Sequence, residues 1–174
     1  MGVDRMRYLM LGLALAAVSA AATAQDSVWG FFNGDGGAMG AGVQASDGSQ
    51  LLIKCDMPGK HSVYAVVVSS LNLAPPLPPT QFASGPVTVR MDANAPWDDN
   101  WRFNDKFAMA VDKGNVRSLT RLLEKLQNAK AFDITMKPVA KGEVHTKFNV
   151  AGAKDAIDKV YAGCKDNNPL AGSA

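Results

Sequence analysis

The chain has 174 residues, of which 47% are hydrophobic and 20% are charged. This composition fits a single globular domain and excludes collagen-like, coiled-coil and wholly disordered chains. The chain has 18 Lys and Arg residues and 16 Asp and Glu residues, which gives a net charge of +2. That balance is too even to predict a nucleic acid or a membrane surface as a partner.

The N-terminus has the three parts of a secretory signal peptide. Arg5 and Arg7 precede an apolar run over residues 8–18, and small residues then lead to an A-x-A motif at residues 22–24. A membrane anchor is the alternative, but the apolar run is shorter than the roughly 20 residues that span a bilayer. We therefore predict a signal peptide over residues 1–24. The mature protein would be periplasmic or secreted, of the Gram-negative type, with no stable membrane insertion after cleavage.

The mature part contains both cysteines of the chain, Cys55 and Cys164. An even number of cysteines in an exported chain predicts a disulfide. Two free or metal-binding thiols are the alternative, but zinc sites use closely spaced ligands such as C-x-x-C, which this sequence lacks. Cys55 ends an expected strand, and Cys164 continues the apolar stripe of an expected helix. Both sulfurs should therefore face the core.

The first half of the mature chain predicts an antiparallel meander. Strands are expected over residues 29–32, 43–45, 50–55, 61–70, 87–91, 101–103 and 107–111. The five glycines between residues 33 and 42 predict a flexible connection. Prolines lack the backbone N–H donor and fix φ, so the segment Ala74–Pro79 is expected to be an exposed connector. A ligand for a proline-recognising groove is the alternative interpretation of that segment.

The second half predicts two helices and two strands. Asn115 is expected to cap a helix that runs to about Asn128. Its apolar stripe would consist of Val116, Leu119, Leu122, Leu123 and Leu126. Alternating strands follow over residues 132–136 and 144–150, and a last helix carries an apolar stripe from Ala153 to Cys164.

This order predicts an α+β fold: an antiparallel, sandwich-like β-meander with two short helices and one disulfide. It would form a single domain over residues 25–165, followed by a frayed tail over residues 166–174.

The sequence contains no recognisable set of catalytic residues. His61 and His145 are isolated, and neither a G-x-S-x-G nor an S-x-x-K motif is present. The glycine-rich stretch lacks the phosphate-loop pattern. We therefore assign no catalytic residue, no metal and no cofactor.

One loop carries candidate ligand-facing side chains. These are Asp92, Asn94, Trp97, Asp98 and Asp99. Calcium prefers such oxygen ligands, but the spacing of a calcium loop fails at Pro96. Aromatic side chains beside acids can form the edge of a ligand site.

Several short motifs along the mature chain occur in a familiar order. They are Trp29, Leu52–Cys55, the R-x-D of Arg90–Asp92, Trp101, the leucine-rich helix, Phe132–Ile134, Phe148–Gly152, Ala156-Ile157 and Cys164. This order resembles small exported proteobacterial proteins of the VasI/TagO-like family, which is associated with type VI secretion systems. The resemblance implies a periplasmic accessory or structural role and a disulfide between the two matching cysteines. It supplies no catalytic residues.

The sequence therefore favours a non-enzymatic periplasmic accessory or binding protein of the cell envelope. Its expected partner is another envelope protein or a cell-wall component. One alternative is a cell-wall hydrolase that uses Asp92, Asp98 or Asp99 as acid or base. The other is a secreted inhibitor or immunity protein.

Overall fold

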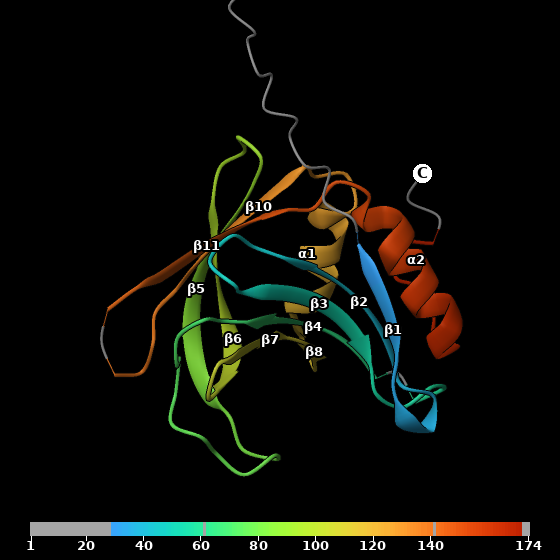
Figure 1. Ribbon diagram of the computed structural model, residues 1–174, viewed down its shortest axis with the longest axis horizontal. Helices are drawn as coiled ribbons and strands as arrows, with labels where there is room; N and C mark the ends of the chain where they lie inside the picture. Colours follow the sequence, from blue (N-terminus) through green and yellow to red (C-terminus); the bar gives the residue numbers. More distant parts are fainter. Residues whose placement is uncertain (1–28, 61, 141, 172–174) are drawn as a thin grey trace, which may run out of the picture.

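The computed structural model describes residues 29–60, 62–140 and 142–171 (Figure 1). The predicted signal peptide lies outside these described residues. The strands are β1 (Gly30–Asn33), β2 (Met39–Gln44), β3 (Gln50–Cys55), β4 (Val63–Val68), β5 (Ala83–Met91), β6 (Trp97–Asn104), β7 (Phe107–Ala110), β8 (Asp112–Lys113), β9 (Val116–Arg117), β10 (Ala131–Met136) and β11 (Val144–Asn149). The helices are the 3-10 turn η1 (Asp35–Gly37), α1 (Ser118–Leu126) and α2 (Ala153–Cys164).

The structure confirms the α+β fold. Nine strands form one antiparallel sheet in the order β1-β2-β3-β4-β7-β6-β5-β10-β11, and β8 and β9 form a separate small hairpin. The chain leaves the meander after β4: β5 lies three positions away in the sheet, and β6 and β7 then fill the two places between β5 and β4. The connection over residues 69–82 therefore crosses the ends of β6 and β7.

The sheet curls until its last strand approaches its first hairpin. The Thr146 hydroxyl on β11 donates a hydrogen bond of 2.9 Å to the Asp47 carboxylate in the β2–β3 turn. The Trp29 indole N–H, just before β1, donates to the carbonyl of Val150 over 3.4 Å. In Figure 1 the strands accordingly form an arch, with α2 beside β1 and β2.

The core lies inside this curl, and its residues are those that the alternation of the sequence predicts. Phe132, Ile134 and Phe148 are all fully buried, and the rings of Phe132 and Phe148 stack with centroids 5.7 Å apart. The four leucines of α1 at positions 119, 122, 123 and 126 are also buried. Trp101 of β6 also lies in the core and is 2% exposed.

The predicted disulfide is present. Cys55 at the end of β3 and Cys164 at the end of α2 are bonded, with their Cα atoms 5.9 Å apart. The helix lies so close to β2 that a Cβ at Gly163 would overlap the Met39 side chain. A disulfide is typical of oxidising compartments, which supports an extracytoplasmic location.

The prediction for the start of the first helix is wrong. α1 begins at Ser118, whereas Asn115 lies in the turn of the β8–β9 hairpin and Val116 is 55% exposed on β9. The role expected of Asn115 belongs to Asp112, whose carboxylate accepts the backbone N–H groups of Leu119 and Thr120. The pattern failed because an acceptor several residues upstream can reach the first turn of a helix when a hairpin folds it back.

The flexible connection predicted over the five glycines is shorter than expected. Residues 34–38 form the turn, but β2 already begins at Met39 and contains Gly40 and Gly42. An added Cβ would come within 2.3 Å of the Phe32 ring at Gly40 and within 2.3 Å of the Leu52 side chain at Gly42. The absence of a side chain at these two positions of β2 lets the Phe32 and Leu52 side chains pack close to the backbone.

Two further observations concern the described helices and the C-terminal tail. Among residues 29–60, 62–140 and 142–171, no helix is both long and apolar enough to cross a bilayer. Within the segment expected to fray, Leu170 is 8% exposed. The amide of Asn168 also donates to Asp158 of α2.

Candidate functional site

The loop that the sequence singles out lies at the β5–β6 turn and the start of β6. The Asp92 carboxylate accepts the backbone N–H groups of Lys130 (3.0 Å) and Ala131 (2.8 Å), and so ties this turn to the start of β10. Asn94 and Trp97 line a small cavity of about 240 Å³. The Lys125 ammonium of α1 lies over the Trp97 ring at 5.2 Å from its centroid.

The structure does not bring the three carboxylates of this loop together. Asp98 and Asp99 are adjacent in β6, so their side chains point to opposite faces of the sheet. Asp98 accepts the Thr88 hydroxyl at 2.6 Å, and Asp99 accepts the Ser118 hydroxyl at 2.9 Å. Each carboxylate thus has a structural contact, and a ligand role for the loop remains a prediction.

The two histidines are separate from this loop. His61 lies outside the described residues. The exposed His145 places its Nε2 3.9 Å from the buried carboxylate of Asp133, which also accepts the Arg90 guanidinium at 2.9 Å. In the described ranges no three His, Cys, Asp or Glu side chains gather as metal ligands would.

A cavity of about 550 Å³, with both polar and apolar lining, is bordered by β4, the β8–β9 hairpin, α1 and α2. Its lining includes Asp112 and Tyr161, but Asp112 is engaged by the start of α1. Burial is the main cause that raises the pKa of Tyr161, and the nearby carboxylates of Asp166 and Asp112 raise it further. The phenol therefore stays protonated at neutral pH and is a poor base there.

The larger opening is a groove of about 650 Å³ on the face of the sheet that points away from the core. Strands β3, β4, β7 and β6 form its floor. Their register aligns four side chains in one row across the sheet: Leu52, Val66, Met109 and Arg102. The neighbouring row adds Val68 and Phe107, which are paired across β4 and β7. In an antiparallel sheet the outer face is usually polar, so this apolar floor is unusual.

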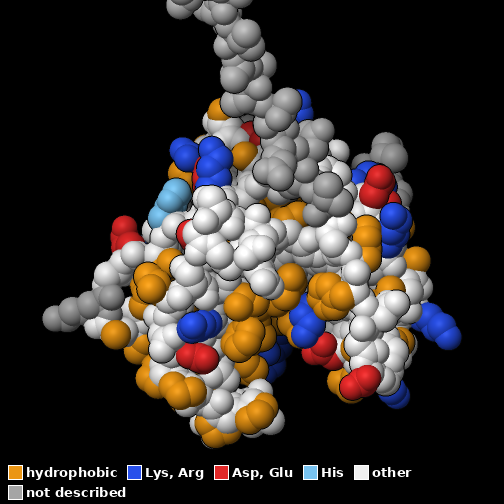
Figure 2. Space-filling view, in the orientation of Figure 1, with side chains coloured by type: hydrophobic (Ala, Val, Ile, Leu, Met, Phe, Trp, Pro, Cys, Tyr) orange, Lys and Arg blue, Asp and Glu red, His pale blue; other side chains and the backbone are white. Residues whose placement is uncertain are grey.

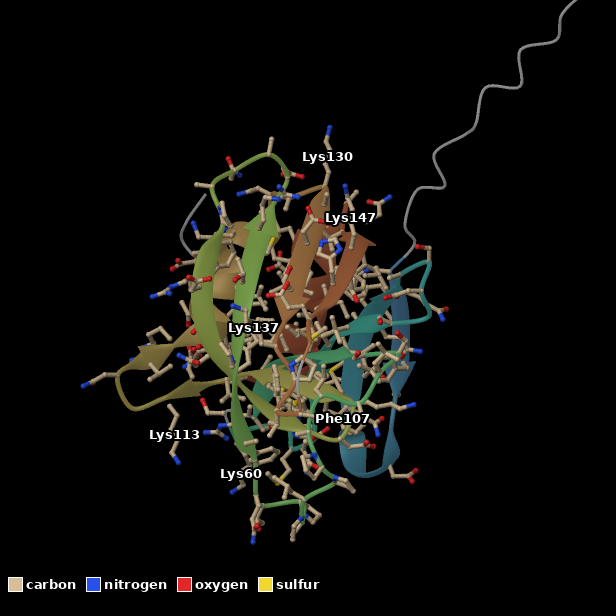
Figure 3. The ribbon with its side chains drawn as sticks, turned by 90° about the vertical axis from the view of Figure 1, so that its left-hand side faces the viewer. Lys60, Phe107, Lys113, Lys130, Lys137 and Lys147 are labelled. Atoms are coloured by element: carbon tan, nitrogen blue, oxygen red, sulfur yellow. A yellow bond between two sulfur atoms is a disulfide. The ribbon has the colours of Figure 1, made fainter. Side chains whose placement is uncertain are left out.

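Two loops form the walls of the groove. The crossover connection supplies Pro79 and Phe82 on one side, and the β3–β4 turn supplies Asp56 and Met57 on the other. Figure 2 shows the lower edge of the molecule hollowed between two lobes, with hydrophobic side chains above the hollow. Phe107 lies in the lower half of Figure 3, at the same end as the crossover connection.

The crossover wall is held in place by the Asn104 side chain of β6 and by backbone hydrogen bonds to the β6–β7 turn. Asn104 accepts the backbone N–H of Leu77 at 2.8 Å and donates from its amide to the Leu77 carbonyl at 3.0 Å. Nearby, the backbone N–H groups of Leu73 and Ala74 both donate to the carbonyl of Asp105. These bonds fix the proline-rich connection against the β6–β7 hairpin, so the groove is a formed feature of the fold.

Almost every polar side chain of the groove already has a partner within the protein. Tyr64 donates to Asp56 at 2.8 Å, and the Lys54 ammonium lies 3.3 Å from the same carboxylate. The Ser62 hydroxyl both donates to the Met57 carbonyl and accepts the Met57 N–H.

Arg102 is the exception. Its guanidinium lies over the Phe82 ring, 5.7 Å from the centroid. No carboxylate of the described residues is within ion-pair distance of it.

This groove was not predicted from the sequence, although β4 carries a signal for it. β4 reads Val63–Val68 with hydrophobic residues at all six positions. A strand with only one buried face would alternate, so a continuous apolar run indicates that both faces are apolar.

Comparison with known proteins adds no assignment: no protein-family model, no curated protein and no solved structure matches this chain. The groove must therefore be interpreted from its own geometry.

Proposed function

We propose that this protein is an exported, non-enzymatic binding protein of the cell envelope that holds an apolar ligand in the outer-face groove. The observation that carries the proposal is the groove itself, about 650 Å³ with an apolar floor. That volume lies within the range of small-molecule sites, which are mostly apolar concavities with a few polar groups. A large apolar patch on the surface of a protein commonly marks a binding site.

A binding test with a matched control addresses the groove directly. An environment-sensitive naphthylamine dye should bind the secreted protein with one equivalent per chain and gain fluorescence. The substitution Met109→Gln places an amide in the middle of the groove floor and should weaken binding about 10-fold, since removing roughly one buried apolar side chain costs ~1.5 kcal/mol or more.

The control is Val116→Gln, which makes a similar change at an exposed apolar residue of β9 outside the groove. It should leave dye binding unchanged. Circular dichroism and thermal unfolding must first show that both variants are folded. Absence of dye binding, or equal loss in both variants, would contradict the proposal. Release of muropeptides from purified cell wall would contradict its non-enzymatic part.

Export is the second element of the proposal. The disulfide and the signal-peptide pattern of residues 1–24 support a periplasmic or secreted location. The small residues Ala22 and Ala24 fit a signal-peptidase site, so the exported protein should begin at Gln25. Intact-mass analysis of the periplasmic fraction measures this start, and a mass that still contains residues 1–24 would refute it. The resemblance to VasI/TagO-like proteins supports a place beside a type VI secretion system, which co-purification with the assembled apparatus would test.

A further inference from the structure

We infer that the ligand of the groove is a single acyl chain that ends in a carboxylate, with the carboxylate bound by Arg102. This inference rests on the proposed function, because it names the chemical class of the ligand for the same groove. The acyl chain would lie across β3, β4 and β7, along the row from Leu52 to Met109. Its carboxylate would meet the guanidinium at the β6 end of that row.

The charge of the groove points to an anion. The carboxylate of Asp56 is engaged by Tyr64 and Lys54, which leaves Arg102 as the lining cation without a carboxylate partner among the described residues. The Phe82 ring under the guanidinium keeps it at the rim while its hydrogen-bond donors remain available. A guanidinium presents its N–H groups in a planar fork that matches the two oxygens of a carboxylate.

The remaining chemistry of the groove disfavours an extended peptide. A peptide would bring a donor and an acceptor with every residue, and burying these without partners costs free energy. The backbone of the floor is already paired within the sheet, since β4 and β7 are interior strands. The side chains of Ser62, Tyr64 and Asn104 are also bonded within the protein. A ligand with a hydrocarbon chain and one anionic group would need only an apolar surface and one cation, and the groove supplies both.

The strand spacing sets a chain length. The row from Leu52 on β3 to Arg102 on β6 crosses three strand spacings, or about 14 Å at ~4.8 Å each. A saturated zigzag chain with bonds of ~1.5 Å and angles of ~111° advances about 1.25 Å per carbon. The row therefore accommodates about 12 carbons. Shorter chains would leave part of the floor wet, and longer ones would extend beyond Leu52 onto β2 and β1.

The direct test is calorimetric titration of the secreted protein with dodecanoate below its micelle concentration. One equivalent should bind, and octanoate and decanoate should bind progressively more weakly, by about 10-fold for each pair of methylenes removed. Dodecanol carries the same chain without the charge and should bind about 10- to 100-fold more weakly than dodecanoate. Dodecyltrimethylammonium, with the opposite charge, should bind still more weakly.

Matched variants separate the contribution of the carboxylate to the binding affinity from that of the acyl chain. Arg102→Gln should reduce the affinity for dodecanoate to that for dodecanol and leave dodecanol binding unchanged. Arg121→Gln removes one charge from an exposed position on α1 and should change neither affinity. Arg102→Lys keeps the charge but not the fork, so its affinity for dodecanoate should be intermediate.

The outcomes distinguish this inference from the proposed function. If dodecanol and dodecanoate bind equally well, and Arg102→Gln changes neither, the carboxylate inference is overturned while the apolar groove stands. If an apolar peptide displaces the dye but dodecanoate does not, the acyl inference is overturned in the same way. If neither the dye nor any amphiphile binds, both the inference and the proposed function fall.

Discussion

Removing the disulfide should destabilise the fold by an amount that can be worked out from its place in the chain. Cys55 and Cys164 are 109 residues apart, so the bond closes most of the described domain into one loop. In the chain-entropy model a loop of that length restricts the unfolded chain by ~4.8 kcal/mol at 25 °C. Both cysteines are fully buried, so alanine is a suitable replacement that introduces no polar group into the core.

The assay is equilibrium unfolding in guanidinium chloride, followed by circular dichroism, for the oxidised protein and for Cys55→Ala/Cys164→Ala. We expect the variant to lose about 4 to 5 kcal/mol of unfolding free energy. A thiol-free reductant should lower the midpoint of the native protein to that of the variant and should leave the variant unchanged. Hydrogen exchange should accelerate in α2 before it does in β10, since α2 is a helix of 12 residues held by tertiary contacts. A loss below ~1 kcal/mol, or equal acceleration in both elements, would refute the reasoning.

Three further predictions concern single side chains. Phe148→Ala removes a fully buried ring and should cost ~3–5 kcal/mol in urea unfolding, whereas a cost under ~1 kcal/mol would mean that its burial contributes little. Asp112→Ala removes the hydrogen-bond acceptor at the start of α1 and should lower the free energy of unfolding by ~0.5–2 kcal/mol in urea. An unchanged free energy of unfolding would mean that the cap is dispensable. Burial raises the pKa of Asp47, but hydrogen bonds from Ser49 and Thr146 outweigh it, so its pKa lies below the ordinary value. Below about pH 4 the carboxylate becomes protonated, so the native protein should lose stability relative to Asp47→Asn. A difference in melting temperature between the two proteins that stays constant down to pH ~3 would contradict this.

Local patterns were sufficient for the parts of the fold whose partners are close in sequence. The alternation around Phe132 and Phe148 predicts two strands with one buried face each, and the two strands pair directly. The stripe of α2 ends at Cys164, which is why the cysteine could be placed facing the core. The start of α1 was mispredicted because its capping carboxylate, Asp112, reaches it only through the β8–β9 hairpin.

The groove depends on contacts that no local pattern contains. Its long wall exists because β5 lies three positions beyond β4 in the sheet, which draws the proline-rich connection across the ends of β7 and β6. Asn104 then binds Leu77, and Arg102 meets Phe82, although each pair is separated by 20 residues or more. From the sequence, the connection could be predicted to be exposed, but not to stand beside an apolar surface.

The two faces of β3 explain how one short strand serves both the core and the groove. Leu51, Ile53 and Cys55 point inward and are fully buried, and the disulfide fixes that side to α2. Leu52 and Lys54 alternate with them and therefore point into the groove. A slip of one residue in the pairing of β3 would exchange these faces and put Lys54 into the core. The disulfide opposes such a slip because Cys55 must stay on the inner face, and so it also keeps Leu52 in the row that leads to Arg102.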